Sequence, residues 1–199
     1  ILACGRSAVA NAKPDLWLVF DEGRDMRTDP DLAAEAVRGS EAAFAELVRR
    51  HQARVRGMAR RLTGSESAGD DIAQATFLTA WQKLGTYAGG TFSAWLCTIC
   101  WREFLQVRRK TRPEIEFDET AEVIPFERPT EKQDDRMDLS RALEKLTEAQ
   151  RVCVVMCVAA GLTHREAAEA TGWPLGTVKS HVLRGVEALR KHLAKPEVA

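Results

Sequence analysis

The chain has 199 residues, 45% of them hydrophobic and 29% charged, and its 29 basic and 29 acidic side chains give a formal net charge of zero. This is the composition of an ordinary globular protein, long enough for one large domain or two small ones. No run approaches the roughly 20 apolar residues of a membrane span, and the five cysteines lack the spacing of a secreted disulfide scaffold, so we expect a cytoplasmic protein without membrane insertion.

The charges are unevenly distributed, and their distribution divides the chain. Residues 31–112 carry 13 basic and 8 acidic side chains, residues 113–138 carry 3 and 10, and residues 139–195 carry 9 and 5. A natural-looking start at Met26 suggests that the residues before it are dispensable. We expect an N-terminal extension that is disordered or non-native (1–25), a first domain (26–112), an acidic linker (113–137) and a second domain (138–195).

The first domain has the pattern of a helical bundle. Apolar residues recur at helical spacing from Asp31 onward, without the alternation of strands. Ser40 has the chemistry of an N-cap for the second helix, whose expected apolar face includes Phe44 and Val48. The expected helices are about 31–38, 41–62, 67–84 and 93–110, and the fold class is all-α.

The fourth helix is apolar around most of its circumference, which is typical of a helix in the middle of a bundle. One polar stripe remains, and a loop with two aromatic side chains precedes the helix. A polar, basic stripe beside aromatic rings is suited to single-stranded nucleic acid, through phosphate contacts and stacking. The alternative is a solvated face whose basic end complements the helix dipole. The candidates are Thr98, Arg102, Gln106 and Arg109 on the stripe, with Tyr87 and Phe92 in the loop.

The second domain is expected to contain four helices, the last two forming a helix-turn-helix. Helices are expected at about 138–146 and 148–160, with Thr147 as the N-cap of the second, which is buried along its apolar run. Thr163 is a plausible N-cap for a short third helix, Gly172 supplies the positive φ of a tight turn, and Pro174 opens the last helix.

The helix from Pro174 to Leu193 has the features of a DNA-recognition helix. Its apolar stripe consists of Val178, Val182, Val186 and Leu189, and its polar face carries Thr177, Ser180, His181 and Arg184. From Pro174 to Lys195 five basic side chains stand against one acidic one. Such an excess, on a chain of zero net charge, favours a phosphate-binding surface.

Two motifs in this order resemble bacterial RNA polymerase sigma factors of the extracytoplasmic-function (ECF) group, in the sigma-70 family. The first is DDIAQATFLTAW (70–81), followed by TFSAWLCTICWREFLQVRRK (91–110). The second is GTVKSHVLRGVEALR (176–190) within the helix-turn-helix. The resemblance covers about residues 31–194 and departs from the commonest pattern at Arg102, where Asn is frequent, and at Gln106, where Asp is frequent.

The resemblance implies a protein that binds the clamp and flap regions of core RNA polymerase, recognises promoter DNA and helps to open it. It also implies an anti-sigma factor as a partner. The matching positions are Asp71, Gln74, Ala75, Leu78 and Gln82 for core polymerase; Tyr87, Phe92, Thr98, Arg102, Gln106 and Arg109 for the −10 element; and Thr177, Lys179, Ser180, His181 and Arg184 for the −35 element. Arg184 is the first choice for a base contact, and Lys179 and Lys191 for phosphate contacts.

The cysteines allow other interpretations of the sequence, and two alternative functions go with them. Cys97 and Cys100, or Cys153 and Cys157, are spaced to share a helix face and suit a zinc site or a thiol switch, although their apolar surroundings favour core packing. A stand-alone helix-turn-helix regulator and a metal- or thiol-responsive sensor are the alternative functions. A thiol oxidoreductase would normally need a βαβ setting, which is not visible. We expect a binding protein, not an enzyme, with no metal and no cofactor.

Overall fold

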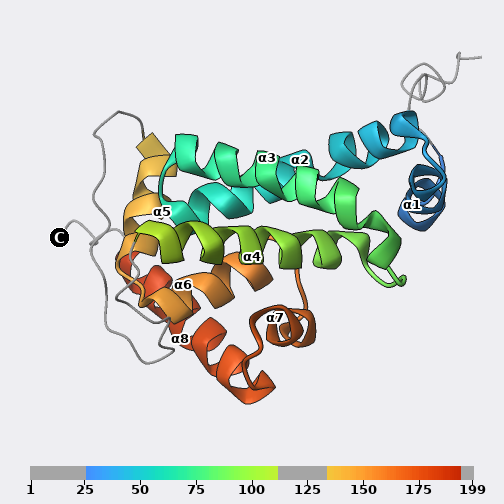
Figure 1. The fold of residues 1–199 in the computed structure, drawn as a ribbon. Coiled ribbons are helices and arrows are strands. Elements are labelled where there is room, and N and C mark those ends of the chain that lie inside the picture. The colour runs from blue at the N-terminus through green and yellow to red at the C-terminus, as the bar shows by residue number, and fades with distance from the viewer. Residues whose placement is uncertain (1–25, 112–133, 194–199) are drawn as a thin grey trace, which may run out of the picture.

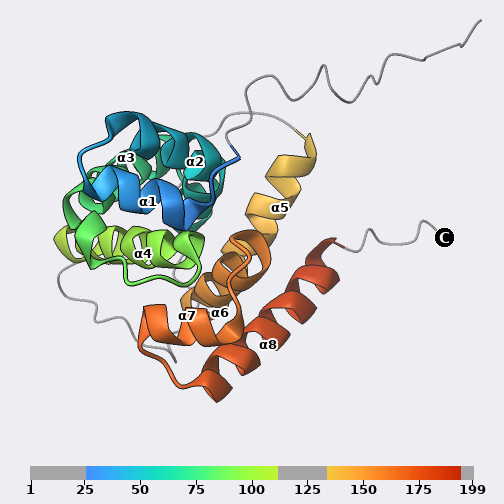
Figure 2. The same cartoon turned by 90° about the vertical axis from the view of Figure 1, so that its right-hand side faces the viewer.

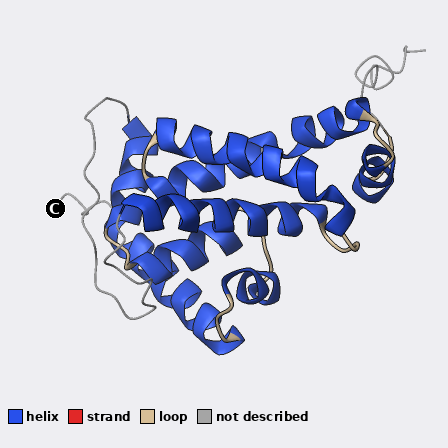
Figure 3. Cartoon of the chain, in the orientation of Figure 1, coloured by secondary structure: helices blue, strands red, loops and turns tan. Residues whose placement is uncertain are grey.

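The computed structural model describes residues 26–111 and 134–193, which form helices with no strand among them (Figures 1 and 3). This confirms the all-α prediction. The first domain contains α1 (Asp29–Val37), α2 (Glu41–Thr63), α3 (Glu66–Lys83), a 3₁₀ turn (Leu84–Thr86) and α4 (Phe92–Thr111). The second contains α5 (Asp134–Glu144), α6 (Glu148–Val154), a π turn (Val155–Ala159), α7 (His164–Thr171) and α8 (Leu175–Leu193).

The hairpin of α2 and α3 is set by local chemistry at the turn and by one glycine on α3. Gly64 ends α2 in the left-handed conformation with φ 67°, and the Ser65 side chain then accepts a hydrogen bond from the Ala68 amide to open α3. Gly69 lets the helices approach closely, because a Cβ at that position would lie 2.6 Å from the backbone of Arg60. The predicted break after α2 is therefore confirmed.

The core of the first domain lies where α2, α3 and α4 meet. Its fully buried side chains include Leu47, Val55, Met58 and Leu62 from α2, Ile72 and Ala80 from α3, and Leu96 and Cys100 from α4. Burying each of the larger ones stabilises the fold by about 1.5–3 kcal/mol. Phe44 and Val48, expected on the apolar face of α2, are only partly buried.

In the second domain the predicted caps are present and one glycine has a role that the sequence did not reveal. Thr147 and Thr163 each form a capping box, with Gln150 and Glu166 respectively, and Gly172 adopts φ 78°. Gly185 is buried where α8 crosses α6, and a Cβ there would lie 2.6 Å from a methyl group of Val154.

Two expected boundaries in this domain are wrong. Helix α5 begins at Asp134, inside the segment expected to be linker and four residues before the expected start. The single buried helix expected at 148–160 ends as a π turn closed by a 2.8 Å hydrogen bond from the Ala160 amide to the Val155 carbonyl. The wider turn rotates Val158 out of the core, so that its side chain is exposed.

The two domains pack against each other through α4. Figure 1 shows α4 between the α2–α3 pair and the second domain, and Figure 2 shows the same arrangement from the side. Helix α4 contacts α7, and α2 contacts the π turn. None of the helices in residues 26–111 and 134–193 is both long and apolar enough to cross a bilayer. The predictions for residues 1–25 and for most of the linker concern residues outside those described.

Candidate protein and nucleic-acid interfaces

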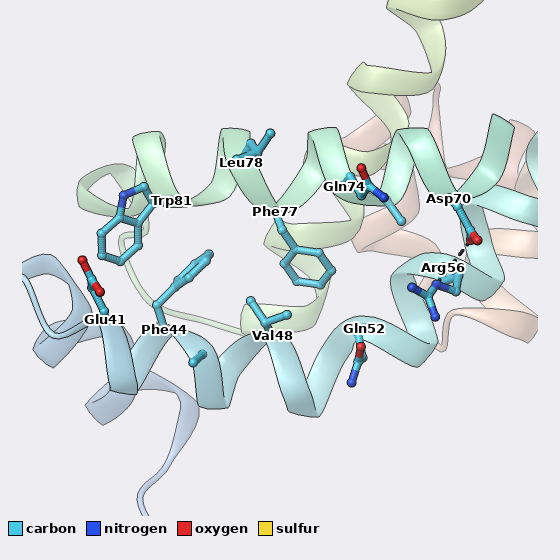
Figure 4. A pocket seen from close by; sticks show the side chains of 12 residues that line it. Glu41, Phe44, Val48, Gln52, Arg56, Asp70, Gln74, Phe77, Leu78 and Trp81 are labelled. Carbon is cyan, nitrogen blue, oxygen red and sulfur yellow. Dashed lines mark ion pairs between the residues drawn. The ribbon is translucent and has the colours of Figure 1, made fainter. Parts of the chain in front are cut away.

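An open apolar groove runs between α2 and α3 in the first domain (Figure 4). It encloses about 650 Å³. Its walls are Phe44 and Val48 from α2 and Phe77, Leu78 and Trp81 from α3. The rings of Phe44 and Trp81 meet across one end, with centroids 4.9 Å apart and planes inclined at 59°. The groove therefore presents aromatic and aliphatic surface from two helices.

The other end of the groove is polar and is fixed by ion pairs. Arg60 donates to both carboxylate oxygens of Asp70, from Nε at 2.9 Å and from Nη2 at 2.8 Å, and Arg56 lies 3.3 Å from the same carboxylate. The hydrogen bonds from Arg60 hold the pKa of Asp70 below its usual value. An apolar floor with a charged end is suited to binding an amphipathic helix.

The residues predicted to bind polymerase lie on the outward face of α3. Leu78 has 66% of its surface exposed, and Asp71, Gln74 and Gln82 are also exposed, whereas Ala75 is half-buried. Of these five, only Gln74 and Leu78 line the groove. Sequence reasoning missed the contributions of α2 because Phe44 and Val48 follow the apolar period of a core face.

The predicted strand-binding stripe on α4 is partly free to bind. Arg102, Gln106 and Arg109 are exposed, whereas Thr98 is half-buried and its hydroxyl donates to the Ala94 carbonyl at 2.9 Å. Basic and amide groups thus line one side of the helix, as the sequence predicted, while the Thr98 hydroxyl is already engaged.

The loop before α4 is held by an aromatic cluster. Phe92 is only 3% exposed and packs between the rings of His51, at 5.3 Å, and Trp95, at 5.4 Å. Tyr87 meets Phe92 edge-on at 5.2 Å, and its hydroxyl donates to the Gly90 carbonyl at 2.6 Å. Burial raises the pKa of Tyr87. Phe92 therefore has no ring face for a base in this conformation and supports the loop, whereas Tyr87 remains partly accessible.

On α8 the apolar stripe faces inward and most of the predicted base-reading residues face outward. Val178 is fully buried, and Lys179, Ser180 and Arg184 are exposed. Thr177 is half-buried. So is His181, whose ring lies 6.0 Å from that of Trp173 in the helix-turn-helix turn.

Leu183 is a residue of α8 that sequence reasoning missed. It is 72% exposed, directly beside Arg184 on the outward face. An apolar side chain on a face predicted to read DNA can contact the methyl group of thymine. The signal was present in the sequence, because Leu183 falls outside the apolar stripe of its helix.

The four cysteines among the described residues belong to the core or lie at its edge. Cys97, Cys100 and Cys153 are buried and Cys157 is partly buried. Burial raises the pKa of each of the first three to about 12 and that of Cys157 to about 11. Within the described ranges, no three His, Cys, Asp or Glu side chains converge in a way that could hold a metal ion.

Comparison with known protein families matches the two domains of this chain to two regions of one family. The family Sigma-70 region 2 matches residues 47–114, and the family Sigma-70, region 4 matches residues 136–189. These matches include the α3 side of the groove, the polar stripe and most of the helix-turn-helix, whereas Phe44 lies just before the first match.

Among the relatives is the ECF RNA polymerase sigma factor SigE of Mycolicibacterium smegmatis, 39% identical over 157 residues, which are 75% of this chain and 61% of that protein. The ECF RNA polymerase sigma factor RpoE of Cereibacter sphaeroides is 32% identical over 182 residues, covering 84% of this chain and 97% of the relative.

Two solved structures have a similar fold. The sigma factor RpoE in complex with the anti-sigma factor NepR, from Bartonella quintana, is 28% identical with a TM-score of 0.62, covering 75% of this chain and 96% of that one. CnrH in complex with the cytosolic domain of CnrY is 27% identical with a TM-score of 0.61, covering 82% and 95%. With its two helical domains and both regional matches, the chain belongs to the extracytoplasmic-function group of the sigma-70 family of RNA polymerase sigma factors.

Proposed function

We propose that this protein binds core RNA polymerase through the groove between α2 and α3 and directs the enzyme to promoters. The observation that carries the proposal is the exposed apolar groove between α2 and α3. One wall of this groove is α3, which contains the motif at 70–81 that resembles the family. Large apolar side chains gathered at a groove on an otherwise charged surface are typical of a protein interface. Trp81 is an expected anchor, since buried aromatic residues dominate binding energy. Leu78 is a second, because its apolar side chain is 66% exposed beside the groove.

The −10 element would be held by α4 and the preceding loop. Arg102 and Arg109 offer charge to phosphates, Gln106 offers an amide to a base edge, and Tyr87 offers a ring for stacking. Extracting a base from the duplex costs a few kcal/mol, which these contacts would have to offset. Family membership and the exposure of three of the four stripe residues support this assignment.

The −35 element would be read by α8 in the major groove. The guanidinium of Arg184 can bind O6 and N7 of one guanine, and Leu183 can meet a thymine methyl group. Lys179 and Lys191 would contact phosphates, which position the helix without reading sequence.

An anti-sigma factor is the expected regulator. Two structurally similar proteins were solved with a bound regulator or cytosolic partner domain. The groove between α2 and α3 is the surface such a partner would need to cover to exclude polymerase. We place the protein in the cytoplasm with the polymerase, and assign it a binding role with no chemistry of its own.

Run-off transcription with core polymerase, with and without the full chain, tests the proposal across a promoter library. We expect transcripts that depend on the chain. We also expect Leu78→Glu to weaken polymerase binding by about 2 kcal/mol or more, because the new carboxylate would have to be desolvated in an apolar contact. Val37→Glu is the matched control, since Val37 is also an exposed apolar residue but lies on α1 outside the groove. Absence of chain-dependent transcripts would overturn the proposal, and equal loss in both variants would remove the groove from it.

A further inference from the structure

The loop before α4, expected to bind the −10 element, is held at its end by Phe92. In this −10 loop (residues 87–91), Gly89 and Gly90 adopt φ 100° and 82°, and both are exposed. The Tyr87 hydroxyl closes the loop on the Gly90 carbonyl at 2.6 Å. The ring of Tyr87 lies edge-on against Phe92, the first residue of α4, with centroids 5.2 Å apart. The position of the Phe92 ring therefore determines where the Tyr87 ring stands.

The residue behind Phe92 is a histidine on the core face of α2. His51 is only 8% exposed, and one turn away on either side lie Leu47 and Val55, each 1% exposed. The centroid of its ring is 5.3 Å from that of Phe92. An apolar side chain would fill such a position without a polar atom that needs a hydrogen-bond partner. Packing alone does not account for a histidine here.

The hydrogen-bond partner of His51 is Asp29, in the first turn of α1. Nε2 of His51 lies 2.8 Å from Oδ2 of Asp29, and because a carboxylate only accepts, this nitrogen donates. Arg50 fixes the carboxylate in turn, since its Nη1 donates to Oδ1 of Asp29 at 3.1 Å and to the Arg27 carbonyl at 2.8 Å. A carboxylate that accepts from one ring nitrogen fixes the orientation of an imidazole. The ring behind Phe92 is therefore fixed from α1.

Asp29 and its helix also lie close to the start of the loop. Helix α1 contacts the 3₁₀ turn (Leu84–Thr86) that leads into it. Burial and, after it, the negative charge of Asp29 raise the pKa of Tyr87, so the carboxylate acts on the phenol across space. A continuous series of contacts thus runs from Asp29 through His51 and Phe92 to Tyr87.

We propose that His51 is a positioning residue for the −10 loop: Asp29 orients its ring, and the ring holds Phe92 so that Tyr87 stands ready to stack on a base. The inference rests on the proposed function, because it concerns the same loop and the same promoter element. It adds to the DNA-binding machinery a pair of residues, on α1 and α2, that need not touch DNA themselves.

A loop fixed in advance favours the opening of the duplex. A loop that samples several positions has to be ordered at the moment when it captures a base, and this ordering opposes capture. The effect should fall on the opening step rather than on polymerase binding, because His51 does not line the groove between α2 and α3. Once the strands are already separated, most of the advantage should disappear.

The test uses His51→Phe in the full chain, bound to core polymerase. This substitution keeps a ring against Phe92 and removes the hydrogen bond to Asp29. Promoter opening is followed by the fluorescence of 2-aminopurine placed in the −10 element of a duplex, and initiation is also measured on a template whose −10 region is mismatched and so already open. We expect opening of the duplex to slow at least about fivefold, the rate equivalent of one hydrogen bond of ordinary net strength. Initiation on the open template should change less than about twofold, and the affinity for core polymerase should not change.

Asp29 supplies the conservative comparison, and Ala53 supplies the control. Asp29→Asn keeps an acceptor for His51 and should retain at least about half of the opening rate, whereas Asp29→Ala should be as slow as His51→Phe. Adding Asp29→Ala to His51→Phe should slow opening no further, because the two substitutions remove the same contact. Ala53→Gln should open the duplex at the wild-type rate, since Ala53 is exposed on α2 and lies outside the groove.

Unchanged opening in His51→Phe, or an equal loss on the duplex and on the open template, would overturn the positioning role. So would an Asp29→Asn variant as slow as Asp29→Ala. If His51→Phe does not fold, Asp29→Ala carries the same comparison of templates, since the Asp29 side chain is 27% exposed and lies outside the core. Failure of the proposed function gives a different result, in which the wild-type chain opens no duplex or Tyr87→Ala opens it as fast as the wild type.

Discussion

Arg184 is the residue on which sequence specificity at the upstream element should depend most. It is exposed on the outward face of α8, and a guanidinium that binds one guanine through two hydrogen bonds discriminates against other bases by about 1–3 kcal/mol. We expect Arg184→Ala to lose about that much affinity for the preferred site and to relax specificity at one position. Binding to a set of single-base variants of the −35 element measures this.

Lys179, on the same helix, provides a comparison for the effect of Arg184 on DNA binding. Lys179→Ala should weaken binding to all sequences about equally and reduce the slope of affinity against salt, because a phosphate contact carries no base information. Uniform weakening in Arg184→Ala would show that Arg184 also contacts only phosphate.

The buried thiols should make the stability of the folded state depend on pH in the alkaline range. Burial raises the pKa of Cys100 to about 12, whereas an unfolded cysteine ionises near pH 8.5. The folded state therefore holds its proton where the unfolded state has lost it, so the thiol's contribution to stability is full below about pH 8.5 and is lost as the pH rises toward 12.

We expect Cys100→Ala to remove part of this alkaline loss. The variant should be less stable than the wild type at pH 7, by a roughly constant packing term of about 1 kcal/mol, and the difference should shrink as the pH rises from 8.5 to 10.5. Urea unfolding at several pH values measures both effects. A difference that stays constant with pH would contradict the assignment.

At the scale of the helices, the close crossing of α6 and α8 is sensitive to a single added methyl group. A Cβ at position 185 would lie 2.6 Å from a Val154 methyl group, and overpacking of this kind costs about 1–3 kcal/mol. We expect Gly185→Ala to lower the free energy of unfolding by that amount in thermal or urea denaturation.

Gly176→Ala is the matched control on the same helix. Apart from its chain neighbours and its own helix backbone, no described atom lies within 4 Å of a Cβ built at position 176. The substitution should therefore be neutral or stabilising by up to about 1 kcal/mol through helix propensity. Equal destabilisation by both substitutions would mean that the crossing is looser than the structure indicates.

The helices also show which features of the fold could be predicted from the sequence. Local signals predicted most element boundaries within two residues, since Ser40, Thr147, Thr163 and Gly172 act through neighbours in the chain. Features that depend on distant partners were missed. The apolar circumference of α4 predicted a central helix, but its second neighbour is the other domain, and Val48 fits a core period although it lines a groove.

At the scale of the whole molecule, the separation of the two DNA-binding units should depend on the length of the connecting segment more than on its composition. Deleting ten of the 22 residues from 112 to 133 lowers the maximum reach of the segment from about 75 Å to about 40 Å, so the two units could separate much less far. We expect this deletion to lower run-off transcription at least tenfold on promoters that need both elements. Each domain should keep its own fold, as measured by circular dichroism.

Replacing the same ten residues with a neutral Gly/Ser sequence of equal length distinguishes the effect of the segment's length from that of its charge. If the segment acts as a tether, this variant should retain most of the activity, because flexible chains of equal length have similar reach. A loss as large as that of the deletion would instead assign a role to the acidic side chains. Full activity of the shortened chain would mean that the two units read promoter DNA while close together.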